Sequence, residues 1–182
     1  GNITTALVAG LTRSDVSSKT NSYIKHITII DHNPEKLTKL KHLFRIDTIN
    51  NLNLLSFIPD IIILAVKPFA IQTACQEIAD YIKPNTIVIS VAAGIPVNNL
   101  IQWLPNNTSI IRAMPNTPTA IGQGMTILYN QSDKKSHNHD SVSITNQLFQ
   151  TVGDTVWVNA EDEINMTMAI AGCGPAYILL LC

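Results

Sequence analysis

The chain has 182 residues, of which 46% are hydrophobic and 14% are charged, and its formal net charge is −1. This length suits one globular domain, or one domain and the beginning of another, with a substantial buried core. The charge excludes a basic surface for nucleic acid or for a membrane, and the longest aliphatic run, residues 61–66, is far shorter than the roughly 18 residues of a membrane span. We therefore expect a small molecule as the partner, with no nucleic acid and no membrane.

The first residues, GNITTALVAGL, predict a helix that begins at once, because Ile3, Leu7 and Leu11 recur at helical spacing. Gly1 and Asn2 suit a tight turn and an N-cap, where free amide N–H groups and the helix dipole attract an anion such as phosphate. A turn with only a structural role is an equal alternative. A strand should precede such a turn, and neither an initiator Met nor a signal-peptide pattern is present, so we expect a fragment that lacks its first strand.

Strands and helices alternate after a polar loop at residues 12–22. Strands are expected at residues 26–31, 45–49, 60–66 and 85–91, and helices at residues 33–44, 68–82 and 96–104. Because the strands are mostly aliphatic without alternation, they indicate a parallel sheet with helices on both faces, which is a doubly wound α/β fold. Ligands of such a fold bind at the carboxyl ends of the strands.

The second half continues the sheet and then changes character. Strands are expected at residues 108–114, 125–129 and 154–158, a helix at residues 141–151, and loops at residues 115–124 and 130–141. The last stretch, residues 161–182, begins with acids and is then almost wholly apolar, which predicts one helix that cannot face water. We expect residues 1–159 to form the α/β domain and residues 160–182 to begin a helical domain, cut off at Cys182, that packs against further helices or a second subunit.

Metal and nucleophilic chemistry lack support in the sequence. The cysteines Cys75, Cys173 and Cys182 are odd in number and without metal-ligand spacing, which predicts free thiols in a reducing cytoplasm and no disulfides. His137 and His139 lie in a polar stretch, where a solvated pair is far commoner than a metal site. There is no nucleophile elbow, HExxH or CxxC motif, so we expect neither hydrolysis nor a metal. A fold that holds a nicotinamide needs little else, because the cofactor carries the hydride.

An acid ends the strand expected at residues 26–31. In a dinucleotide-binding fold, an acid at the position of Asp31 accepts hydrogen bonds from the ribose hydroxyls of NAD. Asp31 lies further from Asn2 than the usual roughly 20 positions, so the loop at residues 12–22 has to be an insertion. The alternative is a solvated turn residue before Asn33 and Pro34.

Three further loops follow expected strands. Lys67 is the only charge in a long apolar stretch and precedes Pro68 at a helix start, which places it to reach a phosphate or ribose; a snorkelling surface lysine is the alternative. Small residues at 90–96 let a flat ligand lie on the backbone, or let helices pack closely. Two prolines around Asn116 and Thr117 make a rigid loop, which is either a binding wall or a stiff connection.

The loop sequences together resemble one family. GN at the first turn, AVKP, SVAAGI, RAMPNTP followed by GQGMT, and GCGPAY are similar, in order and spacing, to pyrroline-5-carboxylate reductase, over essentially the entire chain. RAMPNTP and GCGPAY are the specific motifs. The resemblance implies a Rossmann-like dinucleotide-binding domain and the start of an all-helical dimerisation domain. It implies reduction of 1-pyrroline-5-carboxylate to L-proline by NADPH or NADH, the last step of proline biosynthesis, in the cytoplasm.

The resemblance also implies site residues, but no strong side-chain acid that would act on the imine in catalysis. Those expected at the cofactor, together with Asp31 and His32, are Gly1, Asn2, Ile3, Asn51, Ala65, Val66, Lys67 and Pro68. Those expected near the nicotinamide and the imine ring are Ala92, Ala93, Met114, Pro115, Asn116 and Cys173. Catalysis would consist of holding the hydride close to the imine carbon.

Three residues depart from the family's pattern: Cys173 stands for a serine, Asn165 for an aspartate and Met168 for a threonine. The choice between NADP and NAD stays open, because Asp31 favours NAD while His32 and Lys36 are near enough to hold a 2′-phosphate. The alternatives are another NAD(P)-dependent imine or oxo-acid reductase, or a non-catalytic nucleotide-binding module. We expect a homodimer or higher homo-oligomer through the C-terminal helices. The 182 residues alone should be poorly active and prone to associate through residues 169–181.

Overall fold

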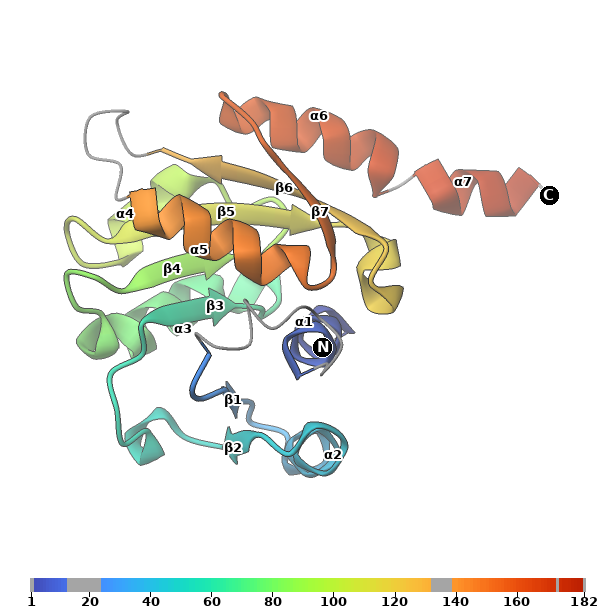
Figure 1. The fold of residues 1–182 in the computed structure, drawn as a ribbon. Helices are drawn as coiled ribbons and strands as arrows, with labels where there is room; N and C mark the ends of the chain where they lie inside the picture. Colours follow the sequence, from blue (N-terminus) through green and yellow to red (C-terminus); the bar gives the residue numbers. More distant parts are fainter. Residues whose placement is uncertain (1, 13–23, 132–138, 173, 182) are drawn as a thin grey trace.

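The computed structural model describes residues 2–12, 24–131, 139–172 and 174–181 (Figure 1). Its α-helices are α1 (Asn2–Thr12), α2 (Pro34–Phe44), α3 (Ile71–Ile78), α4 (Val97–Trp103), α5 (His139–Gln150), α6 (Glu161–Ala171) and α7 (Gly174–Leu181), and its 3-10 helices are η1 (Leu52–Leu54), η2 (Pro68–Ala70), η3 (Ala79–Tyr81) and η4 (Thr117–Ile121). The strands are β1 (Thr28–Ile30), β2 (Asp47–Ile49), β3 (Ile61–Leu64), β4 (Ile87–Ser90), β5 (Ser109–Pro115), β6 (Gly124–Asn130) and β7 (Gly153–Trp157). The expected alternation of strands and helices is confirmed.

The strands form two sheets. β1 pairs with β2 in parallel, and a five-stranded sheet has the order β3-β4-β5-β6-β7. Adjacent strands of the five-stranded sheet run parallel to each other, except β5 and β6, which are antiparallel. The expectation of a purely parallel sheet is wrong at this pair, because the residues between the two strands are too few for a crossover, which takes about a dozen. Both strands are nevertheless largely buried, which is why their sequences resemble those of parallel strands.

Helices cover both faces of the five-stranded sheet. On one face α1 and α5 pack over Ile89 and Ile111, and on the other α3 and α4 pack over Val88 and Ile110. Successive residues of a strand point to opposite faces, so strands covered on both sides are mostly apolar along their length. The predicted doubly wound arrangement is confirmed.

The two-stranded sheet has a smaller core of its own beneath α2. Asn33 caps α2 by accepting a hydrogen bond from the Lys36 N–H at 3.1 Å, Pro34 occupies the first turn, and Arg45 ends the helix in the left-handed region at φ 52°. Val8 of α1 packs into this core, whereas its neighbour Leu7 packs into the core of the five-stranded sheet. α1 therefore lies between the two sheets (Figure 1).

Two predicted helices are broken. The helix expected at residues 68–82 consists of η2, α3 and η3, with Pro68 opening the first turn. The helix expected at residues 161–182 is two helices, α6 and α7; α6 is capped by Gly172, and glycine has a low helix propensity. α7 projects away from the sheets (Figure 1). The loop expected at residues 115–124 contains η4, which ends at Gly122 with φ 74°.

No helix in the described part of the chain is long and apolar enough to cross a membrane. Gly1, Cys173, Cys182 and most of the two polar loops expected at residues 12–22 and 130–141 fall outside the described residues.

Candidate dinucleotide-binding site

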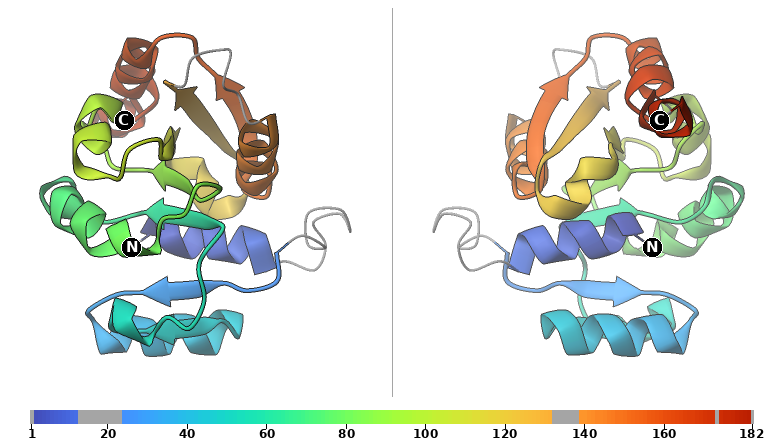
Figure 2. Two further views of the ribbon diagram at one scale, coloured as in Figure 1. Left: turned by 90° about the vertical axis from the view of Figure 1, so that its left-hand side faces the viewer. Right: turned by 90° about the vertical axis from the view of Figure 1, so that its right-hand side faces the viewer.

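Most of the predicted site residues that the structure describes lie at the carboxyl ends of parallel strands. Asp31 and His32 follow β1, Asn51 follows β2, residues 65–68 follow β3, Ala92 and Ala93 follow β4, and residues 114–116 end β5 or follow it. The arrowhead of β1 and the first residues of α1 lie on the same side of the molecule (Figure 2). In an open α/β sheet this edge is where ligands bind.

The first turn of α1 lies at this edge. Asn2 is exposed and Ile3 is half-buried, while Ala6, Leu7 and Val8 behind them are buried. Gly10 lies so close to Thr151 and Val152 that a Cβ there would clash with them. The close packing fixes the direction of α1, whose N-terminal partial positive charge is suited to a phosphate.

Asp31 lies at the end of β1 and is already partly engaged. Its Oδ1 accepts a hydrogen bond from the Asn33 N–H at 2.9 Å, which is an Asx-turn, and its Oδ2 is 3.9 Å from the Lys36 ammonium. The Asp31 side chain is 29% exposed and His32 is exposed, so both are accessible. The turn and ribose interpretations of Asp31 are compatible, because Oδ2 has no partner closer than Lys36 among the described residues.

Asn51 and Lys67 differ in how their side chains are held. The Asn51 Oδ1 accepts a hydrogen bond from the Asn53 N–H at 2.9 Å and caps η1, so its side-chain N–H groups are the ones turned to other partners. Lys67 precedes η2, is exposed, and its side chain caps nothing. Val66, 43% exposed, and Phe69, 88% exposed, flank it with apolar surface. An exposed lysine between apolar residues is suited to a ligand with a phosphate and a flat ring.

The segment after β4 is small and close to the sheet. Ala92 is buried and its N–H donates to the Ser90 Oγ at 3.4 Å, whereas Ala93 and Gly94 are exposed. Gly94 has φ 73°, a conformation that glycine adopts without strain. The exposed backbone here is accessible to a flat ring.

The end of β5 carries the next group of predicted site residues. Met114, Pro115 and Asn116 are half-buried, and the Asn116 Oδ1 accepts a hydrogen bond from the Met125 N–H at 2.9 Å. This bond ties the loop to β6 across η4. The rigid connection expected from the two prolines is thereby reinforced, and the amide of Asn116 has its N–H groups left for other partners.

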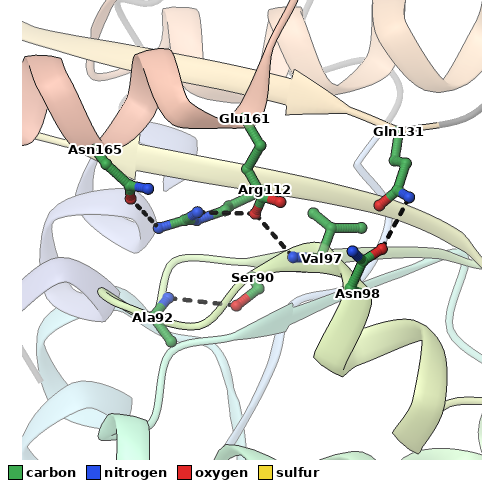
Figure 3. Close-up of polar contacts among 8 residues, drawn as sticks. All are labelled: Ser90, Ala92, Val97, Asn98, Arg112, Gln131, Glu161 and Asn165. Atoms are coloured by element: carbon green, nitrogen blue, oxygen red, sulfur yellow. Dashed lines mark hydrogen bonds and ion pairs between the residues drawn. The ribbon is translucent and has the colours of Figure 1, made fainter.

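A buried ion pair was not predicted from the sequence. Arg112, 1% exposed, donates from Nη1 to the Glu161 Oε1 at 2.8 Å and from Nη2 to the Asn165 Oδ1 at 3.1 Å (Figure 3). The same Glu161 oxygen accepts the Val97 N–H at 2.8 Å. The available signal was an arginine inside an apolar strand, because a guanidinium there requires a carboxylate partner.

Burial and charge shift two titrating groups near these elements. Burial raises the pKa of Tyr129, which pairs with Arg112 across the sheet, and the Glu161 carboxylate raises it further. Burial raises the pKa of the Cys75 thiol to about 11, so this free cysteine stays protonated at neutral pH. Among the described residues no group of His, Cys, Asp and Glu could hold a metal ion.

Together the doubly wound sheet, the helix N-terminus at its carboxyl edge and the loops beside it define a Rossmann-like dinucleotide-binding fold. The chain belongs to the family described as NADP oxidoreductase, coenzyme F420-dependent, whose model matches residues 1–94.

Over its full length the chain is similar to pyrroline-5-carboxylate reductases, which confirms the resemblance inferred from the motifs. It is 32% identical over 181 residues to the enzyme of Pseudomonas aeruginosa, covering 100% of this chain and 63% of that one. It is 32% identical over 178 residues to pyrroline-5-carboxylate reductase 2 of Bacillus subtilis, covering 98% and 61%. The chain thus spans less than two thirds of the length of these relatives.

Solved structures give the same grouping. A pyrroline-5-carboxylate reductase of Coxiella burnetii superposes with a TM-score of 0.84 at 30% identity, covering all of this chain and 64% of that one. The Plasmodium falciparum pyrroline carboxylate reductase, solved with NADP bound, superposes with a TM-score of 0.78 at 25% identity, covering 100% and 63%. A prephenate dehydrogenase from A. aeolicus, at 13% identity over 97% of this chain and 64% of that one, with a TM-score of 0.70, shares the fold alone.

Proposed function

We propose that this chain is the dinucleotide-binding part of an enzyme that reduces 1-pyrroline-5-carboxylate to L-proline with NADPH or NADH. The proposal is supported by 32% identity over 181 residues to a pyrroline-5-carboxylate reductase. It is also supported by the motifs AVKP, SVAAGI and RAMPNTP, which include or follow the carboxyl ends of the neighbouring parallel strands β3, β4 and β5. The site residues and their roles are part of the proposal. The cytoplasm is the proposed compartment, since a free thiol such as Cys75 stays reduced there.

The residues of this chain would bind and orient the cofactor and the substrate, since none of those predicted near the nicotinamide and the imine ring is an acid. The first turn of α1 and Lys67 would hold the phosphates, and Asp31 would hold the adenosine ribose. Ala92, Ala93 and Met114 would lie against one face of the nicotinamide and exclude water from it. When bound, the nicotinamide supplies the hydride that reduces the imine carbon. The substrate is a readily protonated imine, so proximity and orientation account for the acceleration.

We propose that both NADPH and NADH bind, with the choice made at the end of β1. Asp31 would accept from the ribose of NADH, and a 2′-phosphate would meet Lys36, whose ammonium is 3.9 Å from the Asp31 Oδ2, and the exposed His32. The relative from Plasmodium falciparum was solved with NADP bound. In this proposal Asp31 favours NADH and the neighbouring Lys36 favours NADPH.

The strand that we expect ahead of α1 remains a proposal, and the arrangement of the two sheets supports it. Among the described residues, β1 and β3 each have one unpaired edge, and α1 packs into both cores through Val8 and Leu7. A parallel strand leading into α1 would join the sheets. Added in trans as a short aliphatic strand peptide, it should raise the melting temperature of the 182-residue chain, whereas a scrambled peptide should not.

We also propose that the helices after residue 160 begin a helical domain through which the protein forms homo-oligomers. Ile170, Ile178, Leu180 and Leu181 are 64–88% exposed, although they are aliphatic. Exposing such an apolar surface to water is unfavourable, and a surface of this kind is typical of an association site. Replacing Leu180 and Leu181 with Ser should lower the sedimentation coefficient if copies associate there, and an unchanged value would contradict the proposal.

The test of the activity is a reductase assay with the whole protein. Oxidation of NADPH and of NADH is followed separately after addition of 1-pyrroline-5-carboxylate, with an oxo acid as the comparison substrate. Turnover of the imine and not of the oxo acid is the expected result. Binding of either cofactor without turnover of the imine would contradict the proposal.

A further inference from the structure

The ion pair of Arg112 and Glu161 joins three elements that are separate in sequence. Arg112 lies within β5, Glu161 is the first residue of α6, and the Val97 N–H that donates to the same Glu161 oxygen opens α4 (Figure 3). Asn165, one turn further along α6, accepts the second N–H of the guanidinium. One buried cation thus holds two successive turns of α6 against the sheet.

Glu161 also satisfies the start of α4. Val97 is the first residue of α4, so its N–H has no partner within the helix. The Glu161 carboxylate accepts it, and an anion at a helix N-terminus is stabilising. Removing the carboxylate would free the start of α4 as well as the guanidinium.

The segment between β4 and α4 is held mainly at its ends. The Val91 N–H donates to the Leu64 carbonyl at 3.1 Å, the Ala92 N–H donates to the Ser90 Oγ, and the next amide with a described partner outside the segment is that of Val97. Ala93 and Gly94 between them are exposed. Ala92, Ile95 and Val97 also pack in the core, and the bond from Val97 to Glu161 adds the polar contact that fixes the backbone at this end of the stretch.

Arg112 also lies in β5, whose end carries residues proposed at the nicotinamide. It pairs with Ser90 in the register of β4 and β5, and Met114 follows it two residues later on the same face of β5. A shift of the guanidinium would therefore displace both the end of β4 and the end of β5, which flank the proposed position of the nicotinamide.

We propose that Arg112 and Glu161 are positioning residues, which fix the Ala92–Ala93 backbone and the end of β5 for hydride transfer without touching cofactor or substrate. This inference rests on the proposed reductase function. A displacement of about 1 Å costs on the order of a hundredfold in rate. The pair should therefore affect the turnover number much more than cofactor affinity, because the phosphates are held elsewhere, by α1.

The test compares Glu161→Gln with Asn98→Ala in the whole protein. Asn98 is also on the first turn of α4, and its Oδ1 accepts an exposed hydrogen bond from Gln131 at 2.9 Å, so it is a matched control outside the guanidinium network. For Glu161→Gln we expect a fall in kcat of roughly tenfold to a hundredfold. The dissociation constant for NADPH, from its fluorescence, should change less than about twofold, and Asn98→Ala should change neither.

Hydrogen exchange tests the positioning without activity. In Glu161→Gln the amides of residues 91–97 and 161–171 should exchange faster, while those of β1 and α2 should not change. If Glu161→Gln does not fold, Asn165→Ala removes one contact and leaves the ion pair, and it should show the same pattern more weakly. Equal behaviour of Glu161→Gln and Asn98→Ala, or faster exchange everywhere with kcat following the folded fraction, would overturn the inference. Absence of turnover in the unmodified protein would instead refute the reductase proposal and leave the exchange test valid.

Discussion

The two sheets differ in how firmly they hold their part of the site. All four residues of β4 are buried, and the five-stranded sheet has a core on each face. β1 and β2 have three residues each, and only Ile29 among them is buried. The cofactor's nicotinamide half is thus assigned to the well-packed sheet and its adenosine half to the exposed one. Position is critical for hydride transfer, whereas the choice of cofactor needs accessible side chains that can differ between proteins.

The largest expected effect is the loss of a core side chain beneath the five-stranded sheet. Phe149 of α5 is fully buried, whereas Leu43 of α2 is 57% exposed. Phe149→Ala should lower the free energy of unfolding by about 3–5 kcal/mol, because it leaves a cavity, and Leu43→Ala by less than about 0.5 kcal/mol. Urea unfolding followed by circular dichroism measures both. Similar losses for the two variants would contradict the contrast between the sheets.

The next effect is a loss of stability at high pH through Cys75, beneath the same sheet. Its thiol has a pKa of about 11 when folded and 9.0 as the ordinary value. Below pH 9 both states are protonated; between about pH 9 and 11 only the unfolded state loses the proton, so stability falls as the pH rises. The loss reaches about 2–3 kcal/mol by pH 11. Thermal unfolding from pH 8 to 11 should show a shallower decline for Cys75→Ala, and an equal decline in both proteins would contradict the prediction.

The contrast also decides what the sequence could predict. Strands such as β3 and β4 are aliphatic because both faces are buried, so the strands and the helices on both faces of the sheet were predictable. The antiparallel pair β5–β6 was not, because burial on both faces gives the same composition in either direction. The candidate site loops could be proposed because they follow strands. The Arg112–Glu161 pair was missed because its partners are far apart in sequence and meet only once α6 packs on the sheet.

A smaller effect is expected in the exposed sheet, on the choice of cofactor. Asp31→Ser removes the carboxylate that would hold the ribose of NADH and repel a 2′-phosphate. The ratio of kcat/KM for NADPH over NADH should rise about tenfold, the equivalent of about 1.4 kcal/mol. Lys36→Ala should lower the same ratio, and Lys39→Ala, on the same helix, should leave it unchanged. A ratio that is the same in Asp31→Ser and in the unmodified protein would place the selection elsewhere.

The smallest effect asks whether the exposed sheet opens independently. Asn33→Ala removes the cap of α2 and should cost about 1 kcal/mol, while Asn33→Asp keeps an acceptor for the Lys36 N–H and should cost little. If the two-stranded sheet and α2 open on their own, hydrogen exchange in Asn33→Ala should be about fivefold faster in α2 and unchanged in β4. Because α1 packs into both cores, an equal increase in α2 and β4 is the alternative outcome. It would mean that α1 makes the two sheets unfold as one, and that the difference between them is one of exposure and not of stability.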